Sequence, residues 1–191
     1  NYYGNAKIQS LSVVMMGGGM IIAAVIAKPL AKKFGKAEIS VASNMVAGIV
    51  CFLLYFIRPQ NVWVYVAFQF LCWFGLGIFS MVVWALITDV IDYSEIKNGI
   101  REDGSVYALY SFARKLGQAL TSGLSGALLS MIGYKKSTAF DKNVVEGIFD
   151  ISTLLPAISF ILLALILWFW YPLKKKLVDE NVEFLRQKHN K

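Results

Sequence analysis

A short acidic segment between two apolar runs holds the residue types best suited to chemistry. Asp89, Asp92 and Glu95 recur at every third position, so a helix that continues through them would carry all three carboxylates on one face. Aspartates at such spacing beside a membrane helix can hold Mg²⁺ for a membrane transferase. The further acidic motif of such enzymes is missing, because no aspartate follows Asp103 until Asp141. An enzyme that uses Asp89 and Asp92 is therefore the disfavoured alternative.

A structural or gating network of ion pairs is the favoured interpretation of these acids. Like charges this close repel each other, so cations must lie nearby, and Lys97, Arg101, Arg114 and Lys115 are the candidates. Ion pairs at one end of a helical bundle can form when a central cavity closes and break when it opens. The residues predicted for this network are Asp89, Asp92, Tyr93, Glu95, Arg101 and Arg114.

A second polar group lies inside the next apolar run. Counted from Ser105 as a helix start, Lys115 lies about 15 Å along the helix axis, near the middle of a bilayer. A charge at that depth costs a few kcal/mol or more and usually faces a cavity or a charged partner. The spacings of four, three and four predict one polar stripe towards an aqueous cavity, formed by Ser111, Lys115, Gln118 and Ser122.

A neighbouring stripe on the same predicted helix is made of small residues. Gly117, Thr121 and Ser125 recur at every fourth position, a pattern that lets two helices approach closely in a membrane. The sequence thus predicts a helix with one face on a cavity and one face packed on a neighbour. A structural ion pair for Lys115, without a transport role, stays open as the alternative.

The composition points to a membrane protein. Of the 191 residues, 57% are hydrophobic and 16% are charged, against about 25% charged residues in a typical soluble domain. The net charge of +7 does not indicate nucleic-acid binding, because the basic residues flank apolar runs and form no stripe with aromatic residues. Cys51 and Cys72 fall inside apolar runs and are expected to be free thiols, and His189 is the only histidine, so no metal site is predicted.

Five apolar runs are long enough to cross a bilayer of about 30 Å as helices. The predicted spans are 9–30, 38–57, 62–87, 105–133 and 151–171, and residues 172–191 form a charged tail with a short interfacial or solvated helix. The runs are continuous and lack the ten-residue alternation of a membrane β-barrel. The expected fold class is all-α and polytopic, with residues 1–171 as part of a six-helix bundle.

The distribution of lysine and arginine predicts the orientation in the membrane. Loops 28–37 and 88–104 and the tail carry twelve of them, and the other side carries five, namely Lys7, Arg58, Lys135, Lys136 and Lys142. The richer side is expected to be cytoplasmic, with the C-terminus inside. Five spans from an outside start imply at least one further helix upstream, so the chain is expected to be a piece of a longer carrier.

Several of these residues resemble one family closely. The segment DVIDYSEIKNGIREDGSVYALYSFARKLGQAL, residues 89–120, is similar to a cytoplasmic loop and the following helix of the glycoside–pentoside–hexuronide:cation symporters. This group, which includes the melibiose carrier, belongs to the major facilitator superfamily. KPLAKKFGK, residues 28–36, resembles the superfamily's G-x-L-A-D-R-x-G-R loop, although Lys32 stands where an aspartate is usual. Glu146 to Ala157 resembles the start of the family's last helix.

The resemblance implies a fold and a transport cycle. The five spans would be helices 8–12 of a twelve-helix carrier, in which two bundles rock about a central site. Transport of a sugar or glycoside across the inner membrane would be coupled to Na⁺ or H⁺, bound mainly by acids of the missing N-terminal half, with no other cofactor. The implied partners are the sugar, membrane lipid and that N-terminal half. A major facilitator carrier for a non-sugar solute is the alternative.

The resemblance also implies roles for individual residues. Lys115 matches a lysine that points into the central polar cavity near the cation and the sugar. Asp89, Asp92 and Arg101 match a cytoplasmic charge network. Trp84 matches an aromatic residue just before that network, where it could close the cavity floor, stack on a sugar or simply pack.

Overall fold

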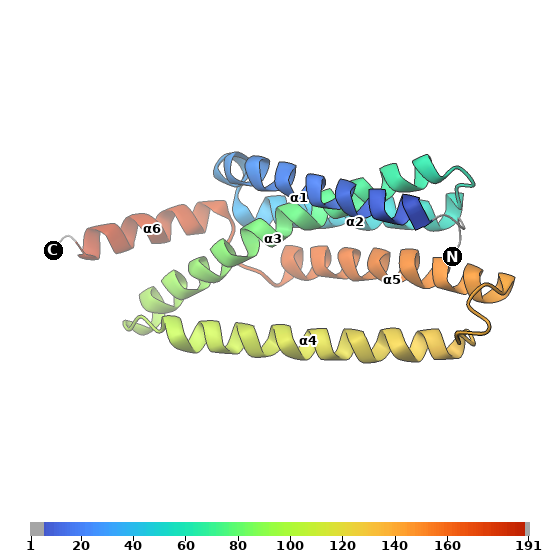
Figure 1. Cartoon of the computed structure of the whole chain (residues 1–191). Coiled ribbons are helices and arrows are strands. Elements are labelled where there is room, and N and C mark those ends of the chain that lie inside the picture. Colours follow the sequence, from blue (N-terminus) through green and yellow to red (C-terminus); the bar gives the residue numbers. More distant parts are fainter. Residues whose placement is uncertain (1–5, 190–191) are drawn as a thin grey trace.

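Six helices make up the computed structural model, which describes residues 6–189 (Figure 1). Their bounds are α1 Ala6–Phe34, α2 Lys36–Ile57, α3 Val62–Asn98, α4 Asp103–Met131, α5 Lys142–Phe169 and α6 Lys175–His189. No strand occurs within these residues, and the predicted all-α fold class is confirmed. Lys191, one of the twelve lysines and arginines assigned to the cytoplasmic side, lies outside the described residues. The side chains of Lys7 and His189 also lie outside the described part.

Four of the six helices are long and apolar enough to cross a membrane, namely α1, α2, α3 and α5. Helix α4 forms where the fourth span was predicted but does not reach the same apolarity, because Arg114, Lys115, Gln118 and several hydroxyl side chains interrupt it. Helix α3 runs eleven residues past the predicted end at Ile87, and α5 begins nine residues before Ile151. A helix can continue into water, so the end of an apolar run does not fix its last residue.

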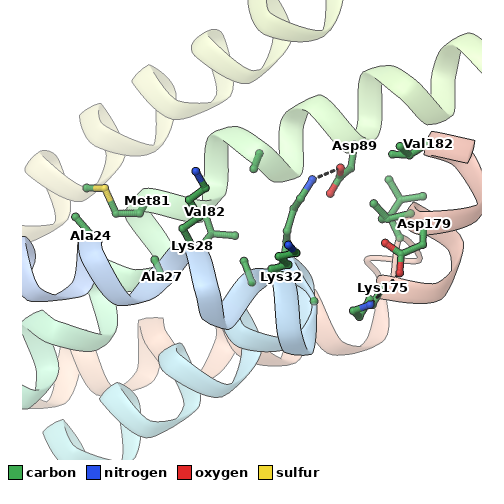
Figure 2. Close-up of a pocket in the computed structure, with 16 residues that line it drawn as sticks. Ala24, Ala27, Lys28, Lys32, Met81, Val82, Asp89, Lys175, Asp179 and Val182 are labelled. Atoms are coloured by element: carbon green, nitrogen blue, oxygen red, sulfur yellow. Dashed lines mark hydrogen bonds and ion pairs between the residues drawn. The ribbon is translucent and has the colours of Figure 1, made fainter. Parts of the chain in front are cut away.

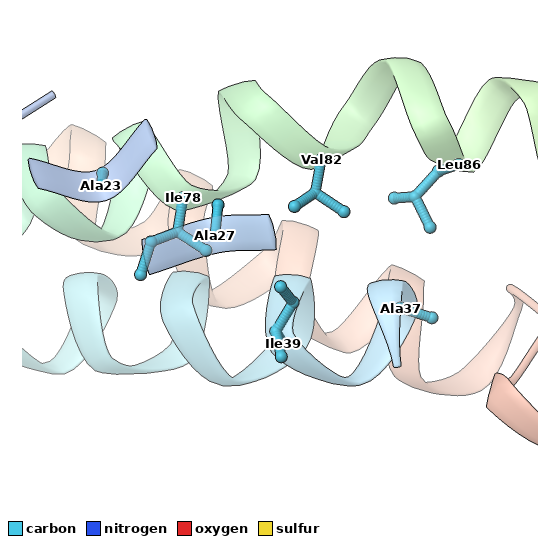
Figure 3. Close-up of a cluster of buried hydrophobic side chains, with 7 residues drawn as sticks. All are labelled: Ala23, Ala27, Ala37, Ile39, Ile78, Val82 and Leu86. Atoms are coloured by element: carbon cyan, nitrogen blue, oxygen red, sulfur yellow. The ribbon is translucent and has the colours of Figure 1, made fainter. Parts of the chain in front are cut away.

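The helices pack in three pairs, α1 on α3, α2 on α3 and α2 on α5. A buried cluster joins α1, α2 and α3 and includes Ala23, Ala27, Ile39, Val82 and Leu86 (Figure 3). Small side chains on α1 let α3 approach closely, and the branched side chains of α2 and α3 fill the space between them. Cys51 and Cys72 are buried, free and in contact across α2 and α3.

Two glycines allow close approach within the bundle. A Cβ on Gly75 of α3 would lie 2.8 Å from the carbonyl oxygen of Ser43 on α2. A Cβ on Gly48 of α2 would lie 3.1 Å from the carbonyl oxygen of Ala157 on α5. Membrane helices use small residues at such crossings because packing, rather than the hydrophobic effect, holds them together in lipid.

Helix α4 is the exception to this packing. None of its described residues is buried, and it contacts α3 beside the α3–α4 connection while it runs apart from α5 (Figure 1). Among the described residues, nothing lies within 4 Å of a Cβ built on Gly117, so the predicted small-residue stripe is open at this position. The predicted packing of this face on a neighbouring helix stays a prediction.

The connections alternate between two ends of the bundle (Figure 1). The turn at residue 35, the α3–α4 connection and α6 lie at one end, which is called the α6 end below. The predicted tail helix is α6, and it is docked on the bundle, since Leu173 just before it and Leu185 near its end are both buried. The backbone N–H of Lys175 also donates to Glu38 of α2 at 2.9 Å.

Candidate transport site and charge network

The three acids of the opening segment share one helix because α3 continues through Asn98. The helix ends at Gly99, whose φ of 79° is left-handed and whose N–H donates to the carbonyl oxygen of Glu95 at 2.9 Å. Glycine suits this cap because it lacks the Cβ that opposes a positive φ. The short connection that follows turns the chain back and places Arg101 beside the acids.

Arg101 binds three carboxylates at once. Its Nη1 lies 2.8 Å from Oδ1 of Asp92 and 3.1 Å from Oε2 of Glu95, and its Nε lies 3.0 Å from Oδ2 of Asp103. The hydrogen bonds that Arg101 donates to Asp92, and then those to Glu95 and Asp103, raise the pKa of Arg101 further above its ordinary value. The guanidinium therefore stays charged and ties the end of α3 to the first turn of α4.

The acid nearest the bundle interior has a different partner. Oδ1 of Asp89 lies 2.5 Å from Nζ of Lys36, and the Asp89 side chain is only 2% exposed. Lys36 is the first residue of α2, and Gly35 before it has a φ of 103°. Sequence reasoning noted Lys36 in the KPLAKKFGK segment but did not pair it with an acid, because only the packing of α3 on α1 and α2 brings the two together.

A third cation comes from the tail. Nζ of Lys188 on α6 lies 3.6 Å from Oε1 of Glu95, whose side chain is 5% exposed. No pattern in the sequence indicates this pair, since the position of α6 depends on how it docks on the bundle. The network at the α6 end therefore joins four elements, the start of α2, the end of α3, the start of α4 and α6. Tyr93 lies half-buried on α3 within the same segment.

Arg114 does not lie in this network. Its guanidinium carbon lies 5.8 Å from the ring centroid of Trp84 on α3. The physical reason is distance along the helix, since Arg114 is eleven residues, or about 16 Å, beyond Asp103. The Trp84 ring also meets Tyr110 edge-on at 5.3 Å and Tyr107 at 6.3 Å between centroids. Both tyrosines were missed, although they recur with Arg114 on one face of α4.

The residues predicted for the cavity lie along α4 and at Trp84. Lys115, Gln118 and Ser122 are exposed, Ser111 is half-buried, and Trp84 is 46% exposed. The hydroxyl of Ser122 donates to the Gln118 carbonyl oxygen at 2.9 Å, so it is satisfied within its own helix. Lys115 has no ion pair with any residue of the described chain. The helix therefore presents a cation and an amide on a face that this chain leaves uncovered.

No group of three or more metal-ligating side chains occurs in residues 6–189. The acids of the opening segment are instead held by cations, Asp89 by Lys36 and Asp92 and Glu95 by Arg101. The arrangement can brace or release the connections at the α6 end, and the face of α4 can meet a polar solute.

Comparison with known proteins shows the family of this chain. Residues 2–175 match the family described as MFS/sugar transport protein, so the chain belongs to that family. The resemblance noted in the sequence is confirmed, and the membrane-enzyme alternative is set aside because the related proteins are transporters and carriers. The chain is part of a multi-pass membrane transporter.

Three relatives illustrate the similarity. The chain is 32% identical over 188 residues, or 97% of its length, to the uncharacterized symporter YjmB of Bacillus subtilis. It is 32% identical over 195 residues, spanning 100% of the chain, to a putative sulfoquinovose importer of Escherichia coli. It is 29% identical over 152 residues, or 80% of the chain, to a putative 2,3-dihydroxypropane-1-sulfonate exporter of Escherichia coli.

The chain spans only part of these relatives. The matched segments cover 40% of the Bacillus symporter, 42% of the sulfoquinovose importer and 33% of the sulfonate exporter.

Proposed function

We propose that this chain is the C-terminal part of a symporter that moves a sugar or glycoside across the inner membrane, coupled to Na⁺ or H⁺. Transport proceeds by alternating access between two helical bundles. One observation carries the proposal. Helix α4 has no buried residue, yet it holds Lys115 about 18 Å along its axis, counted from Asp103. A lysine at that depth in a membrane needs water, a substrate or a counter-charge.

The polar face of α4 supplies one wall of the proposed cavity. Lys115 and Gln118 offer donors to sugar hydroxyls or to an acidic group, and Ser111 and Ser122 keep that wall polar. The rings of Trp84, Tyr107 and Tyr110 form an aromatic edge beside it. The opposite wall and the acids that bind the coupling cation belong to the N-terminal half of the carrier. The isolated chain is therefore expected to bind no sugar with useful affinity.

The network at the α6 end serves as the inner gate in this proposal. The α6 end holds most of the lysines and arginines, which favours a cytoplasmic location for it and for the C-terminus. Lys36–Asp89 and the contacts of Arg101 tie α2, α3 and α4 together while the cavity is closed to the cytoplasm. They loosen when the bundle tilts and the cavity opens.

Substrate uptake tests the proposal directly. Cells that express the complete carrier are given radiolabelled glycosides, and uptake is measured with and without a Na⁺ gradient and with and without a protonophore. Stimulation by one of the two gradients is the expected result. Uptake that neither gradient alters would contradict cation coupling.

A second candidate is a carrier for a non-sugar acid. The relative named as a putative exporter of 2,3-dihydroxypropane-1-sulfonate favours it, together with Lys115 on α4, which has no ion pair within the described residues. Competition for uptake separates the two candidates. A neutral glycoside that competes strongly supports the sugar carrier, and competition by small sulfonates alone supports the second candidate.

A further inference from the structure

A pocket of roughly 600 Å³ lies at the α6 end between α1, α3 and α6 (Figure 2). Lys28 and Lys32 enter it from α1, Lys36 from the start of α2 and Lys175 from α6. Its remaining wall is largely apolar, with Ala24, Met81 and Val82 among the lining residues. The pocket therefore joins a strongly basic rim to an apolar surface.

Two of the four lysines are already neutralised. Lys36 pairs with Asp89, and Lys175 pairs with Asp179 at 2.9 Å between Nζ and Oδ2. Lys28 and Lys32 are exposed and have no ion pair with any residue of the described chain. Four lysines and two aspartates line the pocket, so its formal charge is 4 − 2 = +2. That excess charge calls for an anion.

The position of Lys28 places this rim at the surface of the bilayer. Residues 8–27 of α1 contain no charged side chain, and twenty helical residues span about 30 Å, the thickness of the hydrocarbon core. Lys28 follows at once, and Lys32 lies one turn further on the same face. Ala24 lies one turn before Lys28, on the side of the hydrocarbon. Basic groups thus stand at the level of lipid phosphates, with small apolar residues below them.

The shape of the pocket has a clear origin in the sequence. Ala24, Ala27 and Ala31 line it from α1, and their small side chains leave room beside α3. Helix α6 closes the outer side with Val178 and Val182, which lie one turn apart. A helix that lays apolar side chains against the bundle and charged ones outward is typical of the membrane interface.

From these observations we propose that this pocket binds an anionic phospholipid of the surrounding bilayer. The phosphate lies between Lys28 and Lys32, and an acyl chain runs over Ala24 and Met81. Basic pockets between membrane helices hold anionic headgroups in this way. A free phosphate ion would use the lysines alone and would leave the apolar wall uncovered, so the lipid accounts for both parts of the pocket.

Lipid retention in the complete carrier tests the proposal. The protein is placed in nanodiscs with phosphatidylglycerol, phosphatidylethanolamine or phosphatidylcholine, released, and its bound lipids are counted by native mass spectrometry. The wild type should retain phosphatidylglycerol in preference to the other two. The double variant Lys28→Gln, Lys32→Gln should bind it on the order of twentyfold more weakly, because each surface lysine strengthens binding to anionic lipid several-fold.

A matched control removes the same charge from the same end. Lys33 and Lys176 are exposed and do not line the pocket, so Lys33→Gln with Lys176→Gln should change retention less than twofold. Equal losses in the two double variants would mean general attraction to a basic surface and would overturn the site. A wild type without preference for phosphatidylglycerol would overturn it too, and is expected if the other half of the carrier fills the pocket.

Two further measurements keep the proposal testable if the charge variants fold poorly. Ala24→Phe leaves every lysine in place but fills the apolar wall, and it should weaken retention at least fivefold. Soluble glycerophosphoglycerol, which has the headgroup without acyl chains, should not displace the lipid at equal concentration. Normal retention by Ala24→Phe, or complete displacement by the soluble headgroup, would exclude a lipid as the occupant.

Discussion

The ammonium of Lys36 lies 2.5 Å from the carboxylate of Asp89, although 53 positions separate the two residues. This pair joins the start of α2 to a point nine residues before the end of α3. The Asp89 side chain is 2% exposed and the Lys36 side chain 32% exposed, so the loss of either partner should change the free energy of unfolding by a different amount. Asp89 is buried and needs Lys36 to neutralise its charge, whereas Lys36 can be solvated by water if Asp89 is removed.

The asymmetry of this pair predicts unequal effects of substitution. Lys36→Gln leaves a buried carboxylate without its cation and should destabilise the carrier by about 3 kcal/mol. Asp89→Asn leaves a lysine that can turn towards water and should cost about half as much. Thermal unfolding in detergent, followed by size-exclusion chromatography, measures both. Lys33→Gln is the matched control, and a larger loss for Asp89→Asn than for Lys36→Gln would contradict the assignment.

The three contacts of Arg101 predict that a positive charge at this position is not sufficient for transport. Arg101→Lys keeps the charge but not the planar fork that reaches Asp92, Glu95 and Asp103. Uptake should fall at least fivefold in Arg101→Lys and in Arg101→Gln. The nearby exposed Lys97 makes no ion pair within the described residues, so Lys97→Gln should transport normally.

A charge exchange between Asp92 and Arg101 tests their pairing. Asp92→Arg alone places two cations together and should abolish uptake. Adding Arg101→Asp restores the pair, and the new arginine also faces Glu95, so part of the uptake should return. Recovery stays incomplete because the new acid lies beside Asp103. No recovery in the double variant, with normal amounts of protein in the membrane, would argue against a functional pair.

The uncovered cation of α4 predicts a loss of transport without a loss of folding. Lys115→Ala should reduce coupled uptake at least a hundredfold, while membrane insertion and thermal stability stay near those of the wild type. The exposed Lys135 lies in the α4–α5 connection, and Lys135→Ala should leave uptake unchanged. Uptake by Lys115→Ala within twofold of the wild type would remove Lys115 from the proposed cavity.

The surroundings of two glycines predict different effects of alanine substitution on the stability of the carrier. A Cβ on Gly75 would meet the backbone of Ser43, which cannot turn aside, so Gly75→Ala should destabilise the carrier by about 1–3 kcal/mol. A Cβ on Gly17 meets nothing within 4 Å, so Gly17→Ala should be neutral or stabilise α1 by up to about 1 kcal/mol. Gly75→Ala should lower the melting temperature and Gly17→Ala should not, and equal falls in both variants would contradict the packing of α2 on α3.

Part of the charge network could be predicted from neighbouring residues. Asp92, Glu95 and Arg101 lie within ten positions of each other. Because α3 ends at Gly99, the chain reverses there and Arg101 lies beside the acids of the last turns of α3. Local helix geometry was therefore sufficient to group them. The same reasoning failed for Arg114, because it took no account of how far α4 carries that residue from the acids.

The sequence by itself determined the helical fold class, the membrane environment and the family, because periodic apolar runs, charge balance and a long motif are all local properties of the chain. The tertiary structure decided which distant residues meet. Lys36 finds Asp89, Lys188 finds Glu95, and Lys28 and Lys32 share a pocket with α6 only after helices far apart in sequence have packed. Such contacts depend on crossing positions and helix rotation, which no single segment encodes.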